Sequence, residues 1–453
     1  MCKVVDNFGD AGFVVRLCRA LLSLRDDLCL RVVCDDVGLL LRLEPAFALG
    51  DPVGVPQMSL RWGATNALLL GCHNTTSGCA PTPPVGVPQM SPRWDAPTPL
   101  VGVPQMPLAA GGKRVAVFDW NDGDACKDEF SRRPPRIILE CFQCGRPLWL
   151  EAILFDSSFS QIVQIVNIEY LTAENWADGF HLLKSGTRAA NVKKVNFMPG
   201  FSAKTGGLVL DGPFLHCKED SSYARRVITQ ALGEDFVGEG FDEPFKVLLF
   251  SYPRDLSFLA RAIRRLSSVR RVRVFVASGA GLSSATAALS SAGVEFCELP
   301  FLPQRVWDAL MSLVDFAFVR GEDSFARACL LGRPFVWQAY PQQGQFHLVK
   351  LAAFLQRLAT PAVDRFSFLY NWDSSQEPSY DVWDELSRRG VAGLLQSATP
   401  DRLEALLEQE AFALLEAASR GQLVSPFAHL SRTLLANGNL AEHLLAYLES
   451  LEV

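Results

Sequence analysis

The segment from Val314 to Ala328 constrains the fold most, because it has the pattern of a strand that runs directly into a helix. A short apolar run ends at Val319, the polar turn 320–324 follows, and a helical pattern continues to Leu331. A buried strand that feeds a helix is typical of a parallel α/β sheet. In such sheets, ligands bind outside the carboxyl ends of the strands, where helix N-termini attract anions.

Two interpretations of the turn 320–324 remain open from its residues. Arg320 offers a planar cation suited to phosphate, and Glu322 and Asp323 offer carboxylates that can hold sugar hydroxyls. Alternatively, Asp323 or Ser324 only caps the following helix.

Strand-like and helix-like segments alternate from residue 28 to residue 201 and again from residue 245 to residue 341. This alternation predicts an α/β fold with two Rossmann-like domains that face each other across a cleft, closed by C-terminal helices. We predict an N-terminal domain over 1–213, a second domain over 214–430 and a C-terminal helix over 431–453. Residues 2–6 resemble a strand end with almost nothing before it, so we expect part of the natural N-terminus to be missing.

Residues 44–112 differ from the rest of the chain. The sequence Val-Gly-Val-Pro-Gln-Met occurs there at 53–58, 85–90 and 101–106, among many proline, glycine, serine and threonine residues. Proline interrupts helices and sheets, and the irregular spacing of the copies argues against a solenoid. We predict a disordered, low-complexity insert. A ligand for a proline-recognition module and an artefact of gene prediction are the alternatives.

The composition excludes several classes of protein. A chain of 453 residues with 49% hydrophobic and 20% charged residues is globular, and its net charge of −6 argues against nucleic-acid binding. We see neither an apolar export signal nor a stretch long enough to span a membrane. Twelve cysteines without an export signal therefore predict reduced thiols in a cytoplasmic protein. Cys141 and Cys144 form a C-x-x-C motif without a second pair, which favours buried cysteines over a zinc site.

Motifs of several common enzymes are absent from the sequence. No phosphate-binding P-loop and no G-x-G-x-x-G follows a strand, which argues against P-loop enzymes and ordinary NAD binding. Neither H-E-x-x-H nor a serine nucleophile elbow occurs, and the six histidines are scattered. A histidine-based metal site is therefore not expected.

Six sets of motifs occur in a fixed order along the chain: Val5–Asp10, Asn167–Glu174, Pro199–Phe201 with Thr205–Gly207, Pro300–Gln304, Phe318–Ser324, and Tyr340–Gln342 with His347–Lys350. In order and combination, these motifs resemble those of the bacterial protein-arginine rhamnosyltransferases that modify elongation factor P. The resemblance covers most of the chain outside 44–112. It implies a two-domain glycosyltransferase of the GT-B type that transfers L-rhamnose from dTDP-β-L-rhamnose to an arginine nitrogen of elongation factor P, with inversion and without a metal or other cofactor.

The resemblance implies catalytic roles for Asp6 and Asp10. A guanidinium stays protonated in water, so a carboxylate must orient it and accept a proton. Asp10 would be the base, and Asp6 would hold the guanidinium or support Asp10. The alternative is that Asp10 is only the N-cap of the following helix.

The resemblance also implies a donor site in the second domain. Aromatic rings there can stack on thymine, Arg320 can neutralise the leaving diphosphate, and Tyr340 can donate a hydrogen bond to phosphate. Trp307 is a weaker candidate. Four residues of another motif are either acceptor contacts or domain packing: Asn167, Glu169, Tyr170 and Glu174. The implied donor-binding residues are Phe250, Tyr252, Phe301, Gln304, Arg320, Glu322, Asp323, Ser324 and Tyr340.

Two further hypotheses remain, because the short start and the insert depart from the family pattern. One is a GT-B glycosyltransferase with another donor or acceptor. The other is a catalytically decayed copy that binds nucleotide without turnover.

Overall fold

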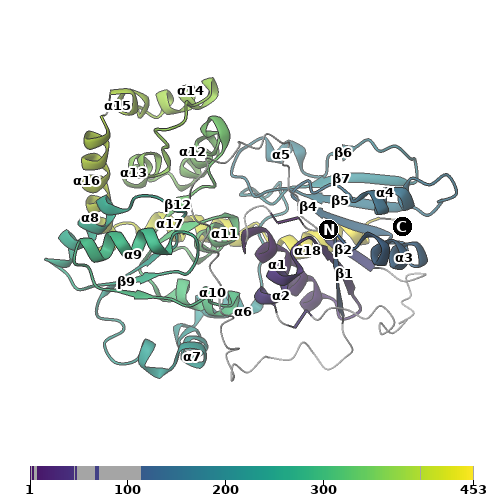
Figure 1. The fold of residues 1–453 in the computed structure, drawn as a ribbon, viewed down its shortest axis with the longest axis horizontal. Helices are drawn as coiled ribbons and strands as arrows, with labels where there is room; N and C mark the ends of the chain where they lie inside the picture. The colour runs from purple at the N-terminus through teal and green to yellow at the C-terminus, as the bar shows by residue number, and fades with distance from the viewer. Residues whose placement is uncertain are drawn as a thin grey trace, which may run out of the picture.

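The computed structural model describes residues 1, 3–4, 8–44, 46–47, 67–70, 114–397 and 399–451. They form two α/β domains, each built on its own sheet, that lie side by side in Figure 1. The predicted α/β class with two Rossmann-like domains is confirmed. Among these residues, no helix combines the length and apolar character needed to cross a bilayer.

The N-terminal domain is built on a seven-stranded sheet with the order β3-β1-β2-β4-β5-β7-β6. All neighbours in this sheet are parallel except β6 and β7. Strand β5 is buried along its whole length, as expected of a parallel strand covered on both faces. The strands are β1 (Cys29–Cys34), β2 (Ala67–Leu70), β3 (Val115–Asp119), β4 (Ile137–Cys141), β5 (Val163–Ile168), β6 (Lys184–Ser185) and β7 (Val192–Phe197).

Helices cover both faces of this sheet. One face packs against α1, α2 and the C-terminal helix α18, and the other packs against α3 and α4. Buried apolar side chains recur along α1 at helical spacing, which explains why this segment is a helix that faces the sheet. The helices are α1 (Phe8–Leu24), α2 (Val37–Leu43), α3 (Gly123–Arg132), α4 (Leu148–Leu154), α5 (Ala177–Phe180) and α18 (Leu440–Glu449).

Strand β2 corrects one sequence prediction. Residues 67–70 belong to the range that we predicted to be disordered, yet they pair in parallel with β1 and β4. The run Ala-Leu-Leu-Leu is apolar, as a strand inside a parallel sheet requires. Most of the predicted insert, including all three copies of the repeat, lies outside the described residues.

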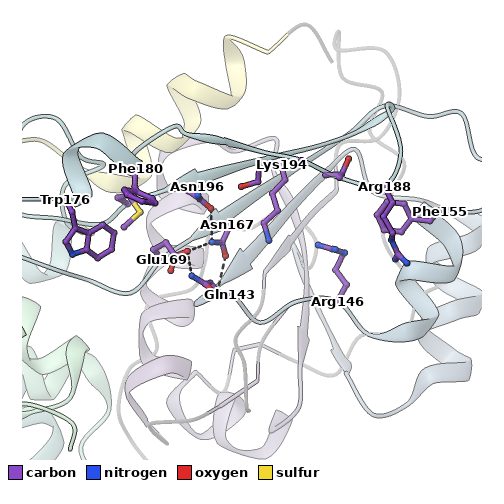
Figure 2. A pocket seen from close by; sticks show the side chains of 14 residues that line it. Gln143, Arg146, Phe155, Asn167, Glu169, Trp176, Phe180, Arg188, Lys194 and Asn196 are labelled. Carbon is purple, nitrogen blue, oxygen red and sulfur yellow. Dashed lines mark hydrogen bonds between the residues drawn. The ribbon is translucent and has the colours of Figure 1, made fainter. Parts of the chain in front are cut away.

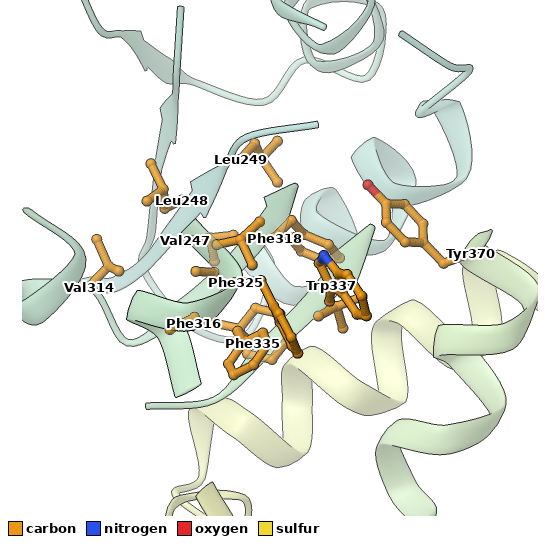
Figure 3. Packing of buried hydrophobic residues seen from close by; sticks show 14 of the residues in the cluster. Val247, Leu248, Leu249, Val314, Phe316, Phe318, Phe325, Phe335, Trp337 and Tyr370 are labelled. Atoms are coloured by element: carbon orange, nitrogen blue, oxygen red, sulfur yellow. The ribbon is translucent and has the colours of Figure 1, made fainter. Parts of the chain in front are cut away.

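The second domain contains a five-stranded, fully parallel sheet with the order β10-β9-β8-β11-β12. Figure 3 shows how aromatic and aliphatic side chains of β8, β11 and β12 interlock beside Phe325 and Tyr370. The direction of strand succession reverses between β8 and β11, and such a reversal marks a ligand site in open α/β sheets. The strands are β8 (Phe245–Leu249), β9 (Val272–Val276), β10 (Phe296–Glu298), β11 (Phe316–Arg320) and β12 (Phe335–Gln338).

The remaining helices surround this second sheet, and α12 to α16 gather above it in the view of Figure 1. Among them, α8 packs against α16, and α11 packs against α17. These elements are α6 (Gly212–Glu219), α7 (Ser221–Leu232), η2 (Glu234–Val237), α8 (Ser257–Ser267), α9 (Leu282–Ser291), α10 (Gln304–Leu313), α11 (Glu322–Leu331), η3 (Gln343–Gln345), α12 (His347–Leu358), α13 (Pro361–Asn371), α14 (Tyr380–Arg388), α15 (Ala392–Ser397), α16 (Pro400–Ser419) and α17 (Val424–Ala436).

The C-terminal segment differs from the single helix predicted over 431–453. Helix α17 ends at Ala436 and packs on the second domain, whereas α18 starts at Leu440 and packs against α1 of the first domain. Between them, Gly438 has a φ of +90°, a conformation that glycine adopts without strain, and Asn439 caps α18. The chain therefore returns to the N-terminal domain through this short break.

Candidate active site at the domain boundary

An arginine–aromatic cluster, made of Phe250, Tyr252, Arg320 and Tyr340, lies where the order of the second sheet reverses. Phe250 and Tyr252 follow β8, and Arg320 is the last residue of β11. The guanidinium carbon of Arg320 lies 4.5 Å from the ring centre of Phe250 and 4.6 Å from that of Tyr252. A planar cation held between two rings combines a charge for phosphate with surfaces for a flat base.

Two rings adjoin Phe250 and Tyr252: Tyr340, which follows β12, and Trp307, in the first turn of α10. The ring of Tyr340 meets that of Tyr252 edge-on at 5.6 Å, and Tyr340 is 48% exposed. The ring of Trp307 meets that of Phe250 at 5.0 Å, which makes Trp307 a stronger candidate than the sequence indicated. Phe301 follows β10 and is 38% exposed.

Three other predicted donor residues contact the N-terminal domain instead of this cluster. The backbone N–H of Leu171 donates to Oε2 of Glu322 at 3.1 Å. Nε of Arg16 donates to Oδ1 of Asp323 at 2.6 Å, and Nε2 of Gln304 donates to the carbonyl of Gly12 at 2.9 Å. The predicted donor residues therefore form two neighbouring groups, and one of these groups joins the domains.

The turn before α11 also differs in detail from the predicted pattern. Arg320 belongs to β11 and pairs with Gln338, so the strand ends one residue later than predicted. Gly321 is the N-cap, with a φ of +67°, and Ser324 is buried in the first turn of α11. The alternative that Asp323 or Ser324 caps this helix is wrong, because both residues lie inside the helix.

Arg16 is the charged centre of the domain boundary. Its guanidinium makes a two-pronged ion pair with Asp308, with nitrogen–oxygen distances of 2.6 and 2.9 Å, and it also binds Asp323. Burial alone would lower the pKa of Arg16, but Asp308 and Asp323 raise that pKa above its ordinary value. Arg16 is therefore a permanent cation that ties two carboxylates of the second domain to α1.

Asp10 lies at the same boundary, in the first turn of α1, and is 3% exposed. With Glu322 and Asp323 it lines a small enclosed space of about 30 Å³, which we call the boundary cavity. Asp10 is the third residue of the helix, so the alternative that it is the N-cap is wrong. Asp6, the other predicted catalytic residue, lies outside the described residues.

A larger hollow opens beside the boundary cavity in the N-terminal domain, with a volume of about 950 Å³ (Figure 2). We call it the open pocket. Its floor carries Gln143, Asn167 and Glu169, and Trp176 and Phe180 stand at one end. Glu169 lines both the open pocket and the boundary cavity. The sequence left Asn167 and Glu169 as either acceptor contacts or domain packing, and it assigned no role to Gln143, Trp176 or Phe180. In the structure Glu169 directly follows β5, and Gln143 lies two residues after the end of β4.

Within the described part of the chain, no three His, Cys, Asp or Glu side chains gather closely enough to hold a metal ion. Cys141 and Cys144 are both buried, and burial raises the pKa of the Cys141 thiol to about 12. The expected buried cysteines are therefore confirmed.

Comparison with known proteins identifies the family. The model of the family "Elongation-Factor P (EF-P) rhamnosyltransferase EarP" matches residues 105–449, a range that starts after Asp10. A protein-arginine rhamnosyltransferase of Shewanella oneidensis is 31% identical over 303 residues, which cover 60% of this chain and 75% of that protein. One from Pseudomonas putida is 28% identical over 333 residues, which cover 66% of this chain and 86% of that protein.

A solved structure on EarP-mediated arginine glycosylation of translation elongation factor EF-P is 21% identical, with a TM-score of 0.38. The overlay covers 56% of this chain and 75% of that chain. The family match covers more than half of the sequence and agrees with the predicted GT-B fold of two Rossmann-like domains. The chain therefore belongs to the EarP family of EF-P rhamnosyltransferases and is a protein-arginine rhamnosyltransferase.

Proposed function

We propose that this enzyme transfers L-rhamnose from dTDP-β-L-rhamnose to an arginine side chain of elongation factor P, with inversion at the sugar. The donor assignment rests on the position of Arg320. Its guanidinium lies close to the rings of both Phe250 and Tyr252, where the strand order of the second sheet reverses. In this proposal the thymine stacks on the aromatic rings of the cluster. Arg320 neutralises the diphosphate, the task that a metal ion performs in other enzymes.

The boundary cavity supplies the proton chemistry of the proposal. The acceptor nitrogen attacks the anomeric carbon, the bond from that carbon to the diphosphate oxygen breaks, and dTDP leaves with the electron pair. Asp10 takes the proton from the attacking nitrogen as the general base. Burial of Asp10 and its place beside Glu322 and Asp323 support this role. Asp6 remains a proposed partner of Asp10.

The direct test is incubation of the protein with elongation factor P and dTDP-β-L-rhamnose, followed by mass spectrometry of the acceptor. We expect the mass of one added deoxyhexose on one arginine. A folded sample that adds no sugar would contradict the proposal and favour a decayed copy. The other alternative is a GT-B glycosyltransferase that uses a different donor. Calorimetry with a panel of nucleotide sugars tests it, because a preference for UDP-sugars over dTDP-sugars would indicate another donor.

A further inference from the structure

Glu169 lies between the open pocket of the N-terminal domain and the boundary cavity. It follows β5, where it lines the open pocket, and it also lines the boundary cavity that contains Asp10. A group at this position reaches a ligand that enters through the wide hollow and extends toward the catalytic carboxylate.

Two side-chain amides hold one oxygen of this carboxylate. Nε2 of Gln143 donates to Oε1 of Glu169 at 2.8 Å, and Nδ2 of Asn167 donates to the same oxygen at 2.5 Å. Nδ2 of Asn167 also donates to Oδ1 of Asn196 at 3.1 Å, which fixes the Asn167 amide (Figure 2). We call Gln143 and Asn167 the amide clamp. In the part of the chain that the structure describes, no hydrogen bond to Oε2 is seen.

The backbone beside the clamp is strained. Phe142 and Gln143 are consecutive residues other than glycine with φ values of +61° and +54°. This conformation turns the chain after β4 so that the backbone N–H of Gln143 donates to Oδ1 of Asn167 at 3.2 Å. Strain of this kind persists where the surrounding structure holds it, and it is concentrated at functional sites. Here it directs Gln143 toward Glu169.

The negative charge of the Glu169 carboxylate, which the amide clamp holds in place, favours binding of a cation. Among the residues with described placement, no Lys, Arg or His nitrogen forms an ion pair with Glu169, although Arg146 and Lys194 of the same pocket pair with Glu140. Neutral amides orient the Glu169 carboxylate without neutralising its charge. A carboxylate presented in this way is suited to a guanidinium, whose N–H groups match carboxylate geometry.

We propose that Glu169 binds the guanidinium of the acceptor arginine and presents one of its nitrogens to Asp10, with the arginine entering through the open pocket. This inference rests on the proposed function. In the transfer step Asp10 takes the proton, and Glu169 only holds and orients the guanidinium. Trp176 and Phe180, which are 48% and 47% exposed at the end of the pocket, offer rings against which the arginine stem and its neighbours pack.

The test measures acceptor binding separately from sugar transfer. Calorimetric titration with elongation factor P, without donor, gives the Kd of the wild type and of Glu169→Gln, which keeps the shape of the side chain and removes its charge. We expect the Kd to rise at least tenfold and the KM for the acceptor to rise with it, while the KM for the donor stays unchanged. The matched control is Asp178→Asn on α5, between Trp176 and Phe180. The Asp178 carboxylate accepts from Oγ of Ser202 at 2.5 Å, and the residue lines neither hollow.

A second acceptor shows whether weaker binding by Glu169→Gln comes from loss of the contact with the arginine or from a change elsewhere in the binding surface. Elongation factor P with methionine in place of its target arginine should bind the wild type and Glu169→Gln equally, because the group that Glu169 contacts is gone. If Glu169→Gln does not fold, Gln143→Asn tests the role of Glu169 instead. Asparagine tolerates a positive φ, but its side chain is too short to reach Glu169. We expect that variant to weaken acceptor binding several-fold.

The outcomes distinguish the two proposals. An unchanged Kd for Glu169→Gln, or an equal loss for both acceptors, would overturn the role of Glu169. If the wild type binds elongation factor P but transfers no sugar, the proposed function fails, and the binding loss in Glu169→Gln still supports the guanidinium site. If the wild type does not bind elongation factor P, both proposals are overturned.

Discussion

Arg16 of α1 and Asp308 of α10 form a buried, two-pronged ion pair across the domain boundary, with nitrogen–oxygen distances of 2.6 and 2.9 Å. Both side chains are 4% exposed, so little water screens them. Replacing one partner leaves the other as a buried charge. Replacing an exposed pair leaves the remaining charge in water.

We expect Arg16→Met to lower the free energy of unfolding by about 3–5 kcal/mol, because Asp308 would remain buried without its main partner. The matched control is Arg132→Met, which removes an exposed pair with Asp128 within α3 and should cost about 0.3–0.5 kcal/mol. Urea unfolding followed by circular dichroism measures both. Equal losses in the two variants would show that the boundary pair does not stabilise the fold.

Asp10→Asn should lower the rate of sugar transfer by about 10²–10⁴-fold, the usual contribution of a general base. Its affinity for the donor should stay the same, because the amide keeps the shape of the side chain. Asp124→Asn is the control, since Asp124 also occupies the first turn of a helix but is exposed on α3. Rates come from mass spectrometry of the acceptor over time. A normal rate in Asp10→Asn would remove Asp10 from the mechanism.

Arg320→Lys should weaken binding of dTDP-β-L-rhamnose by about tenfold, because lysine keeps the charge but loses planar contact with the two rings and forked hydrogen bonding to phosphate. Arg273→Lys on β9 is the control, because that exposed side chain lies about 6 Å from its nearest rings. Titration calorimetry measures both affinities. Unchanged binding in Arg320→Lys would place the diphosphate elsewhere.

Gly279→Ala should weaken donor binding several-fold through its contact with Arg320. A methyl group at Gly279 would lie 3.3 Å from Nη2 of Arg320, and its φ of +136° does not suit other residues. Gly233→Ala is the control, because Gly233 also has a backbone conformation that only glycine adopts readily, with φ +92° and ψ 163°, but its added methyl group would meet no atom within 4 Å. Both variants should lose stability, and only the first should lose donor affinity. Equal donor affinities would contradict the prediction.

His181 should make the fold sensitive to acid. Its Nδ1 accepts from the backbone N–H of Met198 at 3.1 Å, and burial, with a smaller effect of His443, lowers its pKa from 6.5 to about 4. As the pH falls from 6.5 to 4, His181 binds a proton in the unfolded chain but stays neutral in the folded protein. The free energy of unfolding should therefore fall between pH 6.5 and pH 4, by about 1–2 kcal/mol after solvent screening.

Urea unfolding at pH 7, 5.5 and 4.5 measures this effect. In His181→Asn the loss between pH 7 and pH 4.5 should be smaller than in the wild type. His429→Asn, which changes an exposed histidine on α17, should keep the wild-type pH dependence. An unchanged pH dependence in His181→Asn would show that another group is responsible.

Local patterns in the sequence predicted much of the fold. The apolar runs of β8 and β11, and the helical spacing after each of them, need only neighbouring residues, so the parallel α/β class followed from them. The same patterns placed Phe250, Tyr252 and Arg320 at strand ends. The irregular texture of 44–112 concealed β2, whose partners β1 and β4 lie far away in the sequence.

The sequence by itself determined the family, the two sheets and the positions of the candidate residues along their strands. Only the tertiary structure decided their partners: that Asp323 binds Arg16, that α18 returns to α1, and that Glu169 is shared by two hollows. The physical reason is distance along the chain. Arg16 and Asp323 are separated by 307 positions, and no local periodicity or turn preference specifies a contact of that range.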